Sequence, residues 1–144
     1  MNEHVDIVRV GFTGTHVGMT HAQMYAFRDL LATLHSDGAE FHHGDCIGSD
    51  ETAAGYARKG GFYVVMHPPV DPSRRAFTAA DETRRAMPYL ARNREIVDET
   101  DQLVATPKGL EYTRSGTWST VRYARKAGKQ VTIVWPDGRV EVES

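Results

Sequence analysis

Three short turns rich in glycine and hydroxyl side chains are the parts of this sequence best suited to bind an anion. Ser115-Gly116-Thr117 follows the apolar run Leu103-Val104-Ala105 and opens a segment of helical periodicity. Thr13-Gly14-Thr15 and Gly44-Asp45-Cys46-Ile47-Gly48 each follow another strand-like run. Backbone N–H groups at the start of a helix attract phosphate, and a glycine lets the phosphate approach the backbone. The three turns together predict a nucleotide ligand.

Each turn also has a purely structural interpretation. Ser115 is of a type preferred at helix N-caps, and Gly116 can simply make a tight turn. The hydroxyl groups of Ser115 and Thr117 can instead donate to phosphate oxygens. Taken alone, this turn fits a cap better than a ligand site. Its occurrence with two similar turns favours phosphate binding.

Two acidic residues in the second turn are the candidates for catalysis. Asp50 stands at the start of an expected helix, where it can cap the helix or accept hydrogen bonds from a ribose. Asp45 lies within the turn and could bind a sugar or a water molecule. In an N-glycoside hydrolase, either could stabilise or attack the oxocarbenium-like centre. The sequence contains neither a Gly-x-Ser-x-Gly elbow nor a phosphate-loop Gly-Lys-Ser/Thr motif.

Arg92-Asn93-Arg94 is the clearest basic candidate. Successive residues on a helix are about 100° apart, so the two arginines cannot share one narrow face. One of Arg92 and Arg94 can bind phosphate while the other is solvated or ion-paired. The alternative is a solvated helical face with acidic residues nearby. Asn93 could hydrogen-bond a base or a loop backbone.

The histidines do not predict a metal site. His42 and His43 are adjacent on an expected strand, so they point to opposite faces and cannot easily share one pocket with Asp45 and Cys46. His16 is better placed, in the loop after the first strand, where it can touch phosphate or face water. We expect neither a metal ion nor a cofactor.

Short apolar runs alternate with helical patterns along the chain, which is typical of an α/β protein with a mostly parallel central sheet. The expected fold is a Rossmann-like three-layer sandwich. Thr20 and Gln23 predict a capping box for the first helix, which Gly38 would end. Pro136-Asp137-Gly138 predicts a turn into an antiparallel C-terminal edge strand at 139–142. The other expected strands are 7–12, 40–43, 62–66, 101–106 and 131–135, and the other expected helices are 50–59, 89–99 and 117–126.

The composition indicates one globular domain spanning residues 1–144. A net charge of -2 gives no general reason to bind nucleic acid. The single cysteine excludes an internal disulfide and indicates a reducing compartment. No apolar leader at Met1 to Asp6 and no membrane span is expected, so we predict a cytoplasmic location. The oligomeric state stays open, a homo-oligomer included.

Four motifs, taken in order, resemble the SLOG superfamily over nearly the whole chain. The resemblance is strongest to the YspA-like branch, in the group that also includes YpsA-like proteins, LOG phosphoribohydrolases and the Rossmann domain of DNA-processing protein A. Each motif is weak alone, but their order and spacing are specific. They are Gly11-Phe12-Thr13-Gly14-Thr15, the stretch from Gly44 to Ala53, Arg92-Asn93-Arg94-Glu95-Ile96-Val97 and Ser115-Gly116-Thr117.

The resemblance implies a Rossmann-like fold with a pocket for a nucleotide or nucleotide-derived ligand at these turns. LOG enzymes cleave the N-glycosidic bond of nucleoside monophosphates with a glutamate three residues after the Gly-Thr pair, where this chain has Thr120. His16 stands where relatives often have arginine. The resemblance does not fix an activity, and Thr120 counts against hydrolysis of the LOG type. Because the anion-binding turns come without a paired catalytic group, we favour a sensor or sequestering protein, for example for an NAD- or ADP-ribose-derived molecule, over a nucleotide N-glycoside hydrolase.

Overall fold

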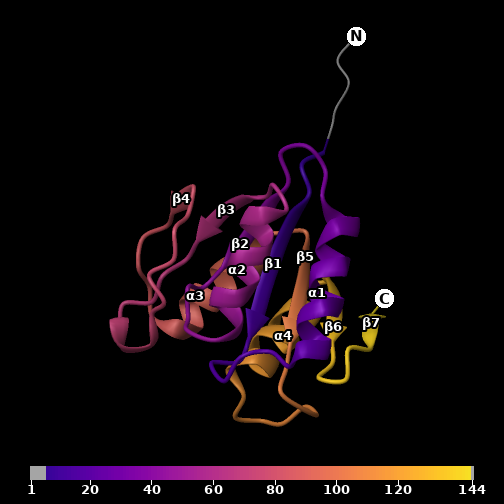
Figure 1. Cartoon of the computed structure of the whole chain (residues 1–144). Coiled ribbons are helices and arrows are strands. Elements are labelled where there is room, and N and C mark those ends of the chain that lie inside the picture. The colour runs from indigo at the N-terminus through magenta and orange to yellow at the C-terminus, as the bar shows by residue number, and fades with distance from the viewer. Residues whose placement is uncertain (1–5, 144) are drawn as a thin grey trace.

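The computed structural model describes residues 6–143, so the predicted absence of a leader at 1–5 lies outside the described residues. These residues form a seven-stranded sheet in the order β4-β3-β2-β1-β5-β6-β7 (Figure 1). The strands are β1 (Arg9–Gly14), β2 (Glu40–His43), β3 (Tyr63–Met66), β4 (Glu82–Thr83), β5 (Gln102–Thr106), β6 (Gln130–Val134) and β7 (Val140–Glu143). The α-helices are α1 (His21–Leu34), α2 (Ser49–Lys59), α3 (Tyr89–Asp98) and α4 (Gly116–Lys126), with a short 3-10 helix at Pro72–Arg74.

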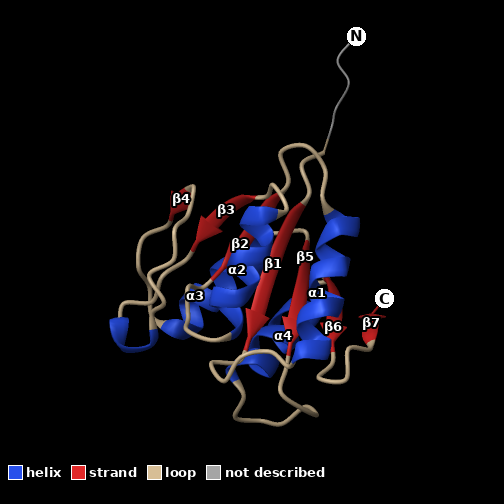
Figure 2. Ribbon diagram, in the orientation of Figure 1, coloured by secondary structure: helices blue, strands red, loops and turns tan. Residues whose placement is uncertain are grey.

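The helices cover both faces of the sheet, which gives the expected three-layer α/β sandwich. Helices α1 and α2 lie on one face and α3 and α4 on the other (Figure 2). All neighbouring strands are parallel except β6 and β7. From β1 the chain first adds β2 and β3 on one side and then returns to place β5 on the other. Ligands of such sheets bind at the carboxyl ends of the strands where the order reverses, here β1 and β5.

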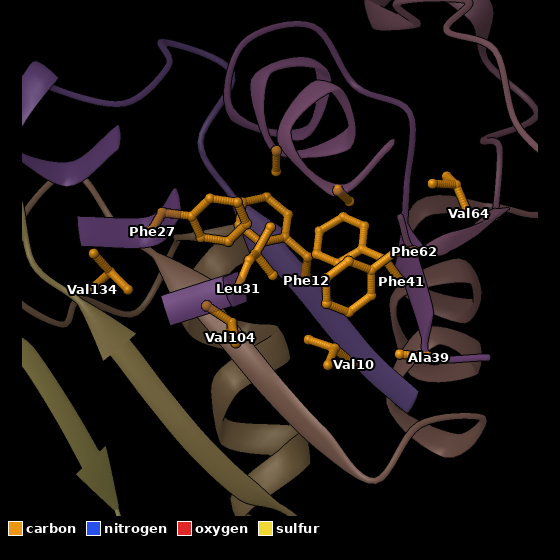
Figure 3. Packing of buried hydrophobic residues seen from close by; sticks show 12 residues of the cluster. Val10, Phe12, Phe27, Leu31, Ala39, Phe41, Phe62, Val64, Val104 and Val134 are labelled. Carbon is orange, nitrogen blue, oxygen red and sulfur yellow. The ribbon is translucent and has the colours of Figure 1, made fainter. Parts of the chain in front are cut away.

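Two apolar cores fill the spaces between the sheet and its helices. The core under α1 and α2 is rich in aromatic rings, with Phe12, Phe27 and Phe41 packed together (Figure 3). The core under α3 and α4 is centred on Trp118, which is buried as its place in an amphipathic helix indicates. Side chains of β5 and β6 enter both cores, which is the pattern expected of a sheet covered on both sides.

Most predicted elements are confirmed within one or two residues, and the antiparallel edge strand is present. The capping box of Thr20 and Gln23 forms as predicted. Helix α1 already ends at Leu34, and Gly38 lies in the following turn at φ 79°. Strand β4 and the 3-10 helix were not expected. Strand β4 pairs with β3 over only two residues, which is too short to show a periodic pattern in the sequence. Among residues 6–143, no helix is long and apolar enough to cross a membrane.

Gln23 joins three parts of the fold. Its side chain is buried, and its Nε2 donates to the carbonyl oxygens of Pro107 at 2.9 Å and Val134 at 2.7 Å. Its Oε1 accepts from the N–H of Thr20 at 3.2 Å. Helix α1 is thereby fixed to the ends of β5 and β6, next to the edge where a ligand would bind.

Replacing Gln23 with methionine keeps the volume but leaves two carbonyl groups and one N–H without this partner. We expect Gln23→Met to lower the free energy of unfolding by about 2 to 4 kcal/mol, since each unpaired buried group costs about 1 to 3 kcal/mol. Urea denaturation measures this loss. The control Gln130→Met, at an exposed position, should change stability by less than about 0.5 kcal/mol. Equal effects of the two substitutions would contradict this role of Gln23.

Candidate functional site

A cavity of about 620 Å³ lies at the carboxyl ends of β1 and β5. Its walls come from the turn after β1, the turn after β2, the crossover after β3, α3, and the loop between β5 and α4. The residues that line it are Thr13, Gly14, Thr15, His16, Cys46, Asp71, Ser73, Arg74, Tyr89, Arg92, Asn93, Lys108, Tyr112, Arg114, Ser115, Gly116 and Thr117. The sheet therefore brings the first and third predicted turns together with the Arg-Asn pair of α3.

The lining of this cavity is basic although the chain as a whole is acidic. Four cationic side chains, from Arg74, Arg92, Lys108 and Arg114, accompany a single carboxylate, that of Asp71. Asp71 also caps the 3-10 helix, because its Oδ1 accepts from the N–H of Ser73. The local excess of positive charge fits an anionic ligand. Two half-exposed aromatic rings, Tyr89 and Tyr112, complete the wall.

The N-terminus of α4 opens into the cavity. Ser115 is the N-cap, and its Oγ accepts from the N–H of Trp118 at 3.2 Å, so the capping interpretation is confirmed. A Cβ built on Gly116 would meet no atom within 4 Å. Packing against the protein therefore does not demand a glycine at position 116. The space that its missing side chain leaves, beside a positive helix end, is available to a ligand.

The turn after β1 is packed tightly against the rest of the fold. A Cβ at Gly14 would overlap Ser49 and Thr106, so a glycine is needed there for packing alone. The backbone oxygen of Thr15 accepts from Ser49 N at 3.0 Å, which joins this turn to α2. The buried Oγ1 of Thr15 has no hydrogen-bond partner among the described residues. Thr15 lines the cavity, but this hydroxyl oxygen is itself buried in the protein.

The glycines of the turn after β2 are needed for packing within the protein. Gly48 has φ 89°, and a Cβ there would overlap the backbone of His16. A Cβ at Gly44 would overlap the guanidinium group of Arg92. Neither Gly44 nor Gly48 lines the cavity, although both were expected at the ligand. Their absent side chains let protein groups, not a ligand, come close.

Arg92 is the centre of this region. It is 4% exposed, and its Nη1 donates to Gly44 O at 2.5 Å and His67 O at 3.1 Å. Its Nη2 lies 3.6 Å from the Sγ of Cys46. The guanidinium group thus joins α3 to the ends of β2 and β3. It also lines the cavity, where it can contribute positive charge.

Asp50 is buried and anchors the turn after β2 through hydrogen bonds to its backbone. Its Oδ2 accepts from the N–H groups of Gly44 and Cys46, each at 3.1 Å. Burial raises the pKa of Asp50 to about 6, against the opposing effects of the Arg92 charge and the two N–H groups. It does not line the cavity. Asp50 therefore supports the loop and lies outside the cavity lining.

Asp45 is likewise occupied by the protein. It is fully buried at φ 57°, and its carboxylate accepts from Arg75 Nε, from the N–H of Phe77 and from both the N–H and the hydroxyl of Thr78. Burial alone would raise the pKa of Asp45, but the bonds from Thr78 and Arg75 outweigh it and lower the pKa. Four donors leave this carboxylate little capacity to act on a ligand.

The two arginines of α3 face different cavities, as their angular separation predicts. Arg94 lies over the ring of Tyr123 at 5.2 Å and lines a second cavity of about 450 Å³ between α3 and α4. Asn93 lines both cavities. Thr120 also lines the second one, but its Oγ1 donates to Gly116 O at 2.9 Å. Of the two arginines, Arg92 lines the main cavity and Arg94 does not.

Several cavity residues were not singled out from the sequence as ligand contacts. Lys108 and Arg114 lie in the loop before α4, and Asp71, Ser73 and Arg74 in the crossover. The crossover contains several arginines, and its sequence alone does not indicate that Arg74 is the one that reaches the cavity. His16 lines the cavity as expected.

Solved structures share this fold. The molybdenum cofactor binding protein from the phototrophic bacterium Rippkaea orientalis has a TM-score of 0.69 and 23% identity, over 92% of this chain and 78% of that one. The Moco carrier protein from Chlamydomonas reinhardtii has a TM-score of 0.68 and 20% identity, over 89% and 76%. DNA processing protein A from Helicobacter pylori has a TM-score of 0.60 and 20% identity, over 88% and 64%.

These similarities establish a common α/β Rossmann-like fold. The resemblance to the SLOG superfamily and to its YspA-like branch stays a prediction. No family model and no curated protein matches the sequence.

Removing the buried guanidinium group should weaken the whole region. We expect Arg92→Met to lower the free energy of unfolding by about 3 to 5 kcal/mol, because it leaves Asp50 and two carbonyl groups without this partner. Arg94→Met, two residues along the same helix, is the matched control and should cost less than about 1 kcal/mol. Chemical denaturation of both variants measures these losses of stability. Equal losses of unfolding free energy in the two variants would contradict this structural role of Arg92.

The raised pKa of Asp50 predicts a pH dependence of stability. The folded state holds this proton up to about pH 6, whereas an ordinary aspartic acid loses it near pH 3.8. Stability contributed at this site is thus present at low pH and lost as pH rises from about 4 to about 6. Asp50→Asn should remove that dependence. The difference in unfolding free energy between the two proteins should change by up to about 3 kcal/mol over this range, and a constant difference would contradict the assignment.

Proposed function

We propose that the cavity at the ends of β1 and β5 binds a nucleotide or a nucleotide-derived small molecule, and that the protein acts as a sensor or a sequestering protein for it. The observation that carries this proposal is the charge of the lining, four cations against one carboxylate in a chain of net charge -2. A volume of about 620 Å³ is within the usual range for small-molecule sites, about 300 to 1,000 Å³.

The arrangement of the lining suggests how such a ligand would lie. The N–H groups at Gly116 and Thr117 would contact a phosphate group. Lys108 and Arg114, exposed on the loop before α4, would neutralise its charge. A base or another planar ring would stack on Tyr112 or Tyr89.

The structural neighbours support a small-molecule ligand for this fold. Two of them are described by their ability to bind or carry the molybdenum cofactor. That cofactor therefore belongs among the candidate ligands beside NAD and ADP-ribose. One neighbour binds single-stranded DNA, but the ligand proposed here is small because four basic side chains line one cavity of about 620 Å³.

The hydrolase alternative receives less support from the same geometry. Asp45 and Asp50, its catalytic candidates, are both occupied by internal donors, and neither lines the cavity. Thr120 stands at the position of the LOG glutamate and bonds to its own helix. We therefore propose binding without turnover, in a cytoplasmic protein.

A thermal-shift screen tests the proposal. Nucleoside monophosphates and diphosphates, NAD, ADP-ribose and the molybdenum cofactor are each added to the purified full chain. A ligand at 100 times its Kd should stabilise the fold by about 2.7 kcal/mol. Chromatography of the same mixtures shows whether free base appears. No shift with any member would overturn the proposal, and release of base would favour the hydrolase.

Variants locate the site of any ligand found. Gly116→Val places a branched side chain in the open space at the start of α4 and should reduce affinity by at least about tenfold through steric exclusion. Lys108→Gln should weaken an anionic ligand by a similar factor, since it removes a cation from the lining. Lys59→Gln, exposed at the end of α2, is the matched charge control and should bind normally. Unchanged affinity in both cavity variants would place the ligand elsewhere.

A further inference from the structure

A second cluster of polar side chains lies on the face of the sheet that carries α3, outside both cavities. His42 of β2 and His67, just after β3, are both buried, and Nδ1 of His42 lies 2.8 Å from Nε2 of His67. Glu99, the C-cap of α3, brings its Oε1 to 3.7 Å from the first nitrogen and 3.8 Å from the second. Three possible ligand atoms from three elements thus surround one point.

The hydrogen bonds of the outer nitrogens determine which nitrogen of each imidazole carries the hydrogen. Nε2 of His42 lies 2.8 Å from Oε1 of Glu40, and Nδ1 of His67 lies 2.6 Å from Oε1 of Glu95. A carboxylate only accepts hydrogen bonds, so both outer nitrogens carry the N–H. A neutral imidazole carries a single N–H, so two neutral rings held in this way face each other with the lone pairs of their inner nitrogens.

Two lone pairs at 2.8 Å repel each other unless a cation lies between or beside them. The surroundings favour a cation, because Glu40, Glu95 and Glu99 converge here. Arg9 pairs with Glu40 at 3.3 Å, and Arg84 pairs with Glu99 at 2.9 Å. With neutral histidines, these three carboxylates and two arginines leave one negative charge. Histidines whose second nitrogen donates to a carboxylate are also the usual arrangement around a bound metal.

We propose that His42, His67 and Glu99 bind a divalent transition-metal ion of the zinc type through Nδ1, Nε2 and Oε1. Two imidazoles and one carboxylate suit such an ion better than Mg²⁺ or Ca²⁺, which prefer oxygen ligands alone. Ligands at 2.0 to 2.1 Å from zinc in a tetrahedral site are about 3.3 Å apart, so the two nitrogens need to separate by only about half an ångström.

The position of Glu99 completes the site. Its side chain is 31% exposed, whereas both imidazoles are buried. The ion would enter from this side, and water would supply the fourth ligand. A bound ion would join β2, the end of β3 and the end of α3. The backbone oxygen of His67 also accepts from Arg92, so the ion would stiffen the support of the cavity without entering it.

Metal binding by the full chain tests the proposal directly. After treatment with EDTA and its removal, calorimetric titration with ZnCl₂ should show one ion per chain. Co²⁺ should give the visible absorption of a four-coordinate site. His42→Gln and Glu99→Gln should each weaken zinc binding by at least about 100-fold, and Glu95→Gln, which removes only the orienting carboxylate, by about 10- to 100-fold.

The matched control is Glu82→Gln. Glu82 also pairs with Arg84 but provides no ligand atom, so its variant should bind zinc as the unmodified protein does. Circular dichroism confirms that each variant is folded, and the half-exposed Glu99 can be changed without opening the core. Three results would each overturn the proposal: no zinc bound by the unmodified chain, unchanged affinity in both ligand variants, or imidazole ¹⁵N spectra that show a proton shared by the two rings at saturating zinc.

Discussion

The contact on which this end of the molecule depends is that of Arg92 with the backbone oxygens of Gly44 and His67. A buried guanidinium group needs several acceptors, and these two carbonyls at the ends of β2 and β3 supply them. Asp50 balances its charge while it binds the N–H groups of the same turn. Helix α3, two strands and one loop thus share a single buried polar network. This network holds the cavity residue Arg92 in place without a bound ligand.

The same network explains why two kinds of glycine occur in the predicted turns. Gly14, Gly44 and Gly48 are required by protein atoms that lie where a side chain would be. Gly116 faces open space beside a helix N-terminus. The distinction separates the scaffold of the site from the surface offered to a ligand. It leaves the turn at Ser115-Gly116-Thr117 as a helix cap and as the best candidate of the three for the proposed anion site.

Sequence patterns could predict the fold because they reflect local rules. The capping box at Thr20, the turn before β7 and the alternation of strands and helices need only neighbouring residues. The roles of Asp45 and Asp50 could not be predicted this way, since their donors come from a distant crossover and from the loop they cap. His42 illustrates the same limit. It does point away from His43, but its partner His67 is 25 residues further on, brought near by the pairing of β2 with β3.

The crossover between β3 and α3 has a consequence for the order in which the chain folds. Its hydrogen bonds to Asp45 join residues 30 to 33 positions apart, and β4 contributes only two residues to the sheet. Closing so long a loop costs entropy that is recovered only when Asp45 is already held at the end of β2. We therefore expect the crossover to form after β2 and to open locally. Since Arg74 belongs to it, the cavity is complete only when the crossover is in place.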